Sequence, residues 1–153
     1  MSNAKNIMLR ACAVMMKNSD DYGPRIGEIT IIGNARRNNM EFVLHGRIPS
    51  KKNSRVTLPD GRTIPSSDYS RWQREARKLA KYTWLRAPTA KPVVIRIETN
   101  CRNDADNLAS SVLDMLEGVF YENDRQVREI IVKKRKKERG EDYRTVIRVE
   151  VLD

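Results

Sequence analysis

A chain of 153 residues is long enough to bury one hydrophobic core and too short for two domains of ordinary size. Its 30 lysines and arginines outweigh its 20 aspartates and glutamates, so the formal net charge is +10 and the pI is near 9.9. This charge favours nucleic acid as the partner, with an anionic membrane surface as the alternative, and no apolar run is long enough to cross a bilayer. We therefore expect a cytoplasmic protein with neither a signal peptide nor a membrane anchor. The two cysteines, Cys12 and Cys101, lie far apart and suit a reducing compartment.

The first forty residues differ in pattern from the rest of the chain. We predict that residues 1–40 form an N-terminal extension and that residues 41–153 form the domain. Within the extension the pattern favours a short helix over 6–17 and an edge strand over 27–32. A tail without a functional role is the alternative.

The domain opens with an alternating run that predicts a strand over 41–48. A basic loop follows over 49–55. A turn signal at 59–62 then precedes a helix that Ser66 or Ser67 caps and that runs to about residue 85. One side of this helix is apolar, and we interpret its aromatic residues as packing or dimer contacts: Tyr69, Trp72, Tyr82 and Trp84. The other side is interpreted as a solvated basic face: Arg71, Arg74, Arg77, Lys78 and Lys81.

The second half of the chain alternates strands with one helix. A β-branched run predicts a strand over 93–98, and a helix over 106–117 is stopped by Gly118. Two further strands, 127–133 and 144–151, are predicted to form a hairpin with a basic tip. The order β-α-β-α-β-β predicts a single α+β domain with a mixed sheet and helices packed on it.

An acidic cluster in this basic protein is the main candidate for chemistry. Asp104 and Asp106 stand where a strand gives way to a helix, and Asp124 follows one helix length later. Capping of the helix explains one such acid, because an aspartate before a helix accepts backbone N–H bonds. Two acids in one turn favour a divalent cation, with Mg²⁺ preferred and Mn²⁺ possible for oxygen ligands.

The helix itself adds to this hypothesis. Asp106, Ser110 and Asp114 recur every four residues, opposite the apolar residues expected to face the core: Leu108, Val112, Met115, Leu116 and Val119. A solvated face is the alternative reading of the stripe. This helix contains no lysine or arginine, however, and the absence of cations beside three acids favours a cation supplied from outside. We also expect the connector after Gly118 to bring Asp124 back beside the first two acids.

The segment from Arg102 to Val127 resembles the signature of the RusA-type Holliday junction resolvases, which are bacterial and phage endodeoxyribonucleases. The resemblance rests on Arg102-Asn-Asp-Ala-Asp-Asn-Leu108, Asp114-Met-Leu116 and Asn123-Asp124-Arg-Gln-Val127. The run from Gly46 to Arg55 is similar to the opening of that family. Together these motifs cover residues from about 41 to 152.

The resemblance implies that Asp104, Asp106 and Asp124 are the catalytic, metal-binding acids. It also implies a Mg²⁺-dependent homodimer that cuts opposed strands of a four-way DNA junction, needs no small-molecule cofactor and comes from a prophage. The basic residues that we assign to DNA contact are Lys51, Lys52, Arg55, Arg71, Arg102, Arg125, Lys133 and Lys134. The only histidine, His45, is interpreted as structural.

Two positions depart from the family pattern. Ser110 stands where the family usually has a lysine, and Asn123 stands where it has the first acid of a pair. A lysine or arginine elsewhere is expected to replace the missing cation, from Lys51, Lys52, Arg71 or Arg125. The alternatives are a branched-DNA-binding protein that has lost cleavage and an RNA-binding accessory protein.

Overall fold

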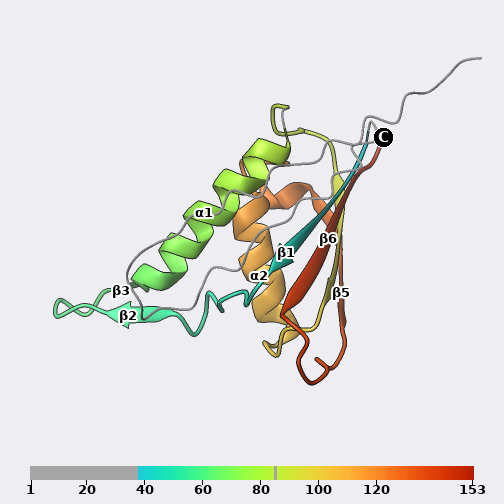
Figure 1. The fold of residues 1–153 in the computed structure, drawn as a ribbon. Helices are drawn as coiled ribbons and strands as arrows, with labels where there is room; N and C mark the ends of the chain where they lie inside the picture. Colours follow the sequence, from blue (N-terminus) through green and yellow to red (C-terminus); the bar gives the residue numbers. More distant parts are fainter. Residues whose placement is uncertain (1–37, 85) are drawn as a thin grey trace, which may run out of the picture.

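The computed structural model describes residues 38–84 and 86–153, and the predicted elements of the N-terminal extension lie outside these ranges. A sheet of four strands is covered on one face by two helices (Figure 1). Its strands, in spatial order, are β1 (Asn39–His45), β6 (Arg144–Val151), β4 (Val93–Thr99) and β5 (Val127–Lys134). Only β4 and β5 run parallel as neighbours, so the sheet is mixed and the predicted α+β class is confirmed. None of the helices in the described ranges is long and apolar enough to span a membrane.

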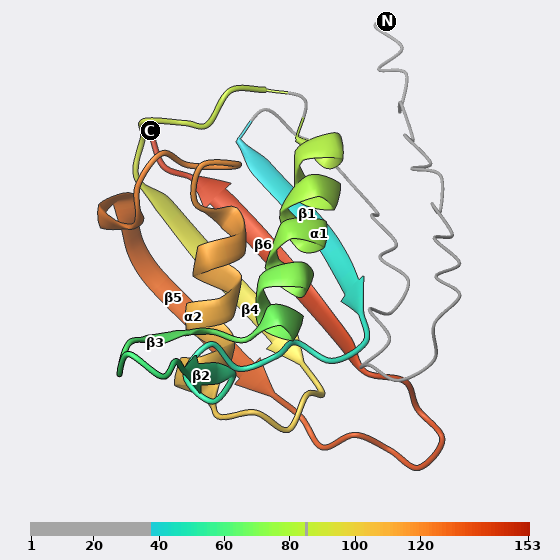
Figure 2. The same cartoon turned by 90° about the vertical axis from the view of Figure 1, so that its left-hand side faces the viewer.

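The two helices lie side by side across the sheet (Figure 2). Helix α1 (Ser67–Thr83) begins after Ser66, whose side chain accepts a hydrogen bond from the Tyr69 backbone N–H at 3.2 Å. This confirms the predicted cap. Helix α2 (Ala105–Leu116) buries the predicted apolar residues against the sheet: Leu108, Val112, Met115, Leu116 and, after its end, Val119. The helices therefore enclose one core between themselves and the sheet.

The predicted hairpin between the last two strands is wrong. Strands β5 and β6 lie on opposite sides of β4, and residues 135–143 cross the end of β4 to connect them. Two buried hydroxyls, Thr99 and Thr145, bond at 2.7 Å where β4 and β6 meet beneath this crossing. Lys133 and Lys134 accordingly belong to an edge strand and not to a hairpin tip.

A real hairpin lies elsewhere, in a region predicted as a loop and a turn. Strands β2 (Arg55–Thr57) and β3 (Thr63–Pro65) pair antiparallel and form a separate two-stranded sheet. All six strand residues of this hairpin are exposed, so it has no buried face that would require an alternating apolar pattern in the sequence. The turn at 59–62 was predicted, but the two strands beside it gave no pattern.

Candidate metal and nucleic-acid site

The candidate site begins at the N-terminus of α2, where β4 ends and the chain turns into the helix. Asp104 occupies the N-cap position, but its side chain makes no capping hydrogen bond to any backbone group that the structure describes. Asp106 lies in the first turn and is also exposed. Helix capping therefore does not account for the Asp104 carboxylate, which is available to a ligand.

The loop over 46–54 lies along the polar side of α2. The Ser111 hydroxyl donates to the Pro49 carbonyl oxygen at 2.7 Å and accepts from the Lys51 backbone N–H at 3.3 Å. The Asn103 amide donates to the Ile48 carbonyl oxygen at 2.7 Å. These bonds fix the loop against the helix and bring its two lysines over the helix acids.

Each of the two lysines pairs with one acid of α2. Lys51 Nζ is 2.8 Å from Asp114 Oδ1, and Lys52 Nζ forms an ion pair with Asp106. The hydrogen bond from Lys52 holds the pKa of the Asp106 carboxyl below its usual value. These two acids therefore have cations beside them, because the loop supplies the lysines that the helix lacks; the absence of lysine and arginine from the helix is no argument for an external cation at these acids.

Asp114 is the centre of a polar network between the two helices. Its side chain is only 16% exposed, and its Oδ2 accepts a hydrogen bond from the Tyr69 hydroxyl at 3.0 Å. Burial, and then the negative charge of Asp114, raise the pKa of Tyr69. The backbone carbonyl of Asp114 accepts from Arg77 at 3.0 Å and from Gln73 at 3.5 Å.

This network was not predicted from the sequence. Arg77 was assigned to a solvated face and Tyr69 to packing or dimer contacts. The available signal was the spacing of Tyr69, Gln73 and Arg77, which are four residues apart and therefore share one side of α1.

Asp124 lies away from the other two acids. It opens the short 3-10 helix η1 (Asp124–Gln126), directly before β5. Because β5 is parallel to β4, both strands start at the same end of the sheet, and Asp124 lies at that end. Asp104 lies at the opposite end, where β4 stops, and the length of α2 separates the two acids (Figure 2). A helix of 12 residues is about 18 Å long. The expectation that the connector returns Asp124 to Asp106 therefore fails within one chain, because the connection is a parallel crossover.

The surroundings of Asp124 are instead formed by the residues after α2. The Tyr121 hydroxyl lies 2.9 Å from Asp124 Oδ1 and 3.2 Å from the Leu113 carbonyl oxygen. Burial, and then the charge of Asp124, raise the pKa of Tyr121. Asn123 caps η1 by accepting from the Arg125 backbone N–H at 2.9 Å, so its amide has a structural role at this position.

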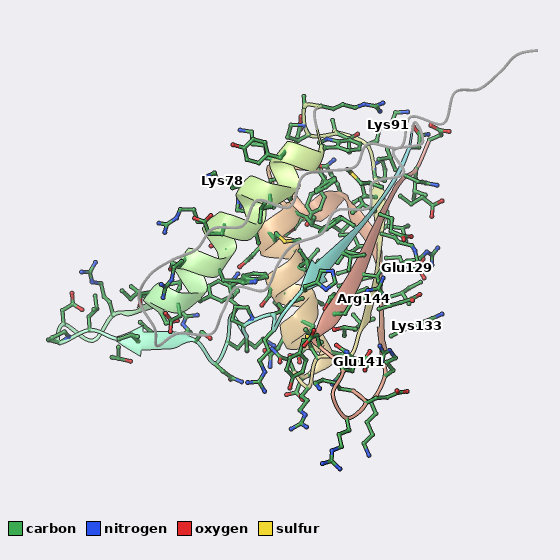
Figure 3. All side chains as sticks on the ribbon, viewed as in Figure 1. Lys78, Lys91, Glu129, Lys133, Glu141 and Arg144 are labelled. Atoms are coloured by element: carbon green, nitrogen blue, oxygen red, sulfur yellow. The ribbon has the colours of Figure 1, made fainter. Side chains whose placement is uncertain are left out.

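The basic residues assigned to DNA contact divide between the two ends of the sheet. Strands β1, β4 and β5 all run in the same direction, so the segments that follow them meet at the end that holds Asp104 and Asp106. Figure 3 shows Lys133 and Arg144 at this end and Lys91 at the other. Of the assigned residues, this end holds Lys51, Lys52, Arg102, Lys133 and Lys134. Arg55 lies on the hairpin, Arg71 pairs with Asp68 on α1, and Arg125 accompanies Asp124.

The first turn of α2 suits a hard divalent cation by its chemistry. It offers the carboxylates of Asp104 and Asp106, and a buried amide oxygen, Asn107 Oδ1, that has no hydrogen-bond partner among the described residues. Oxygen donors of this kind are those that Mg²⁺ prefers. Among the described residues, no three His, Cys, Asp or Glu side chains are grouped as a complete metal site. Asp104 and Asp106 are thus two acidic side chains without a third acid beside them in the part of the chain that the structure describes.

Comparison with protein families agrees with the signature found in the sequence. The family model described as endodeoxyribonuclease RusA matches residues 46–150, from the loop after β1 to the end region of β6. A comparison with curated proteins gives no match. The matched segment is more than two thirds of the chain and contains the three acids, both helices and the two loop lysines. The chain therefore belongs to the RusA family of endodeoxyribonucleases.

Proposed function

We propose that the protein is a divalent-metal-dependent endodeoxyribonuclease that resolves four-way DNA junctions by paired cuts on opposed strands. The observation that carries the proposal is the first turn of α2, where the Asp104 carboxylate is uncommitted and Asp106 is paired with Lys52. Family membership supplies the reaction class. A pair of carboxylates beside several cationic loops suits a phosphodiester, because the cations attract the backbone and the acids hold a metal ion.

Asp104 and Asp106 are the proposed ligands of Mg²⁺, with Mn²⁺ as a substitute. When bound, the ion would polarise the scissile phosphate and lower the pKa of a water molecule that attacks it. The chain's own part is to orient the two carboxylates, which it does by fixing α2 through the loop bonds to Asn103 and Ser111. Selectivity is then expected to come from DNA shape and backbone contacts more than from base edges.

The family usually has a lysine at the position of Ser110, and we propose that Lys52 supplies this positive charge instead. The Ser110 hydroxyl donates to the Asp106 carbonyl oxygen at 2.9 Å, while the Lys52 ammonium reaches the Asp106 carboxylate. If Asp106 held a metal ion, the Lys52 ammonium would be released from that carboxylate and could bind a phosphate oxygen. We expect Lys52→Ala to bind Mn²⁺ at least as tightly and to cleave about a hundredfold more slowly. Lys78→Ala is the matched control, because Lys78 is an exposed lysine on α1. Equal cleavage rates for the two variants would contradict the assignment.

Asp124 is proposed as the third acid, supplied by the second protomer of a homodimer. Within one chain it stands a helix length from Asp106, and a two-fold dimer presents a second copy of each acid. Mixed dimers of Asp104→Asn and Asp124→Asn chains test this. If each site takes its acids from both protomers, the mixed dimer keeps one intact site and makes single nicks. If each site lies within one protomer, both sites of the mixed dimer are damaged and no nicks form.

The reaction itself is tested with an end-labelled four-way junction in Mg²⁺, Mn²⁺ or EDTA. We expect paired, symmetric nicks that require the metal and disappear in Asp106→Asn. Asp153→Asn is the matched control, because Asp153 is an exposed acid that pairs with Lys91, at the other end of the sheet. Tight junction binding without nicks would favour a binding protein that has lost cleavage.

A further inference from the structure

The β2–β3 hairpin extends away from the rest of the domain (Figure 1). It forms a sheet of its own, and all six of its strand residues are exposed. A two-stranded hairpin with no core of its own is marginally stable in water. A hairpin of this kind in a small domain points to a contact with a binding partner.

Two apolar side chains stand together on this hairpin. Val56 and Ile64 are directly opposed across the two strands, so they lie on one face, and they are 48% and 42% exposed. They account for two of the four large hydrophobic residues that are exposed in the described ranges. An exposed apolar pair at a projecting tip is suited to insertion into a partner.

The charge around the pair identifies the partner as nucleic acid. The segment from Ser50 to Ser66 carries four basic residues and one acidic residue: Lys51, Lys52, Arg55, Arg62 and Asp60. The Arg55 guanidinium donates to the Thr63 carbonyl oxygen at 3.2 Å, which leaves its charge on the hairpin surface. An apolar pair flanked by cations complements base stacks flanked by phosphates.

The base of the hairpin is tied to the candidate site. The Ser54 backbone N–H donates to the Ser50 carbonyl oxygen at 2.9 Å, and the Ser66 N–H donates to the Ser54 carbonyl oxygen at 2.7 Å. Lys52, which pairs with Asp106, lies two residues before Ser54. DNA held by the hairpin is therefore held close to the acids.

We propose that the hairpin inserts Val56 and Ile64 between base steps at the branch point of the junction. This inference rests on the proposed function and adds the element that distinguishes a junction from linear DNA. Three residues of strand extend about 10 Å, which is about three base steps of 3.4 Å. Apolar side chains can separate stacked bases, and the energetic cost of doing so is least where pairing is already interrupted.

The test compares wild-type protein with a Val56→Thr/Ile64→Thr double variant, which keeps β-branched side chains and removes apolar surface. Binding to a four-way junction and to linear duplex is measured in EDTA, with 2-aminopurine at the branch point. We expect the ratio of junction to duplex affinity to fall about tenfold, and the fluorescence rise on binding to be lost. Duplex affinity and thermal unfolding should not change.

Ile130→Thr is the matched control, because it makes the same change at an exposed apolar side chain on β5, away from the hairpin. An unchanged ratio and fluorescence in the double variant would overturn the proposal. So would an equal loss of affinity for both DNAs, or sedimentation as a monomer where the wild type is a dimer. Metal-dependent cleavage by the wild type is scored separately, so failure of the nuclease proposal is distinguished from failure of the insertion.

Discussion

The Tyr69–Asp114 hydrogen bond gives the sharpest test of the network between the helices. Tyr69 is 1% exposed, and its hydroxyl lies 3.0 Å from Asp114 Oδ2, while Lys51 lies 2.8 Å from the other carboxylate oxygen. Tyr69→Phe removes one hydrogen bond to a partly buried charge and leaves the ring in place. A bond of this type contributes about 2 kcal/mol, which corresponds to a fall in Tm of about 4–8 °C for a domain of this size.

The assay is urea unfolding of Tyr69→Phe, Asp114→Ala and the double variant, read as a thermodynamic cycle. We expect the two single changes to be coupled by at least about 1 kcal/mol, because each removes the same contact. Tyr82→Phe is the control, and it should lie within about 0.5 kcal/mol of wild type since Tyr82 is exposed. A Tyr69→Phe variant as stable as wild type, or additive changes in the cycle, would refute the reasoning.

Three further predictions follow from individual contacts. Asp104→Ala should change the free energy of unfolding by less than about 0.5 kcal/mol while weakening Mn²⁺ binding, whereas Ser66→Ala should cost about 1 kcal/mol, because the Ser66 side chain forms a capping bond and that of Asp104 does not. A larger loss at Asp104 in urea unfolding would restore the capping interpretation. Gly118→Ala should lower the free energy of unfolding more than Gly61→Ala. Both glycines have positive φ, but a Cβ at Gly118 would lie 3.1 Å from the Arg77 guanidinium, whereas one at Gly61 would meet nothing within 4 Å. Equal losses in unfolding would show that Arg77 moves aside freely. Hydrogen bonds, first from Arg135 and then from the Glu138 backbone, lower the pKa of Glu141 from 4.5 to about 2. The depressed pKa means that this contact stabilises the crossing segment above about pH 4.5 and is lost as the pH falls toward 2. NMR titration of the Glu141 carboxyl should show this pKa, and Arg135→Gln should raise it; a value near 4.5 in wild type would contradict the ion pair.

The elements with a strong hydrophobic period were predictable from the sequence. Val93–Thr99 is a β-branched run, and α2 places Leu108, Val112 and Met115 on one side, so both were found within a residue or two of their ends. Residues 55–57 and 63–65 were missed as strands because both are exposed and no buried face imposes a pattern of two. Local pattern gives the strands but not their partners, which is why β5 and β6 were joined as a hairpin.

The candidate site was predictable in its residue types and not in its geometry. Asp104 and Asp106 are separated by a single residue, so their proximity needed no knowledge of topology. The position of Asp124 depends on whether the strand after α2 runs parallel or antiparallel to β4, which no local pattern decides. The pairing of Lys51 with Asp114 joins residues 63 positions apart and depends on how the loop lies on the helix.

The place of β6 in the sheet also determines the order in which the chain can complete its fold. It follows every other described element in sequence, yet it lies between β1 and β4 and pairs with both. Its partner Asn39 stands opposite Glu150, so this contact closes more than one hundred residues of chain. Such distant pairing slows folding, because the entropy of closing the loop is lost before the contacts form. On the ribosome, β1 must remain without its partner until almost all of the domain has been synthesised, and a product that stops before Arg144 would leave the edges of β1 and β4 open to association with other chains.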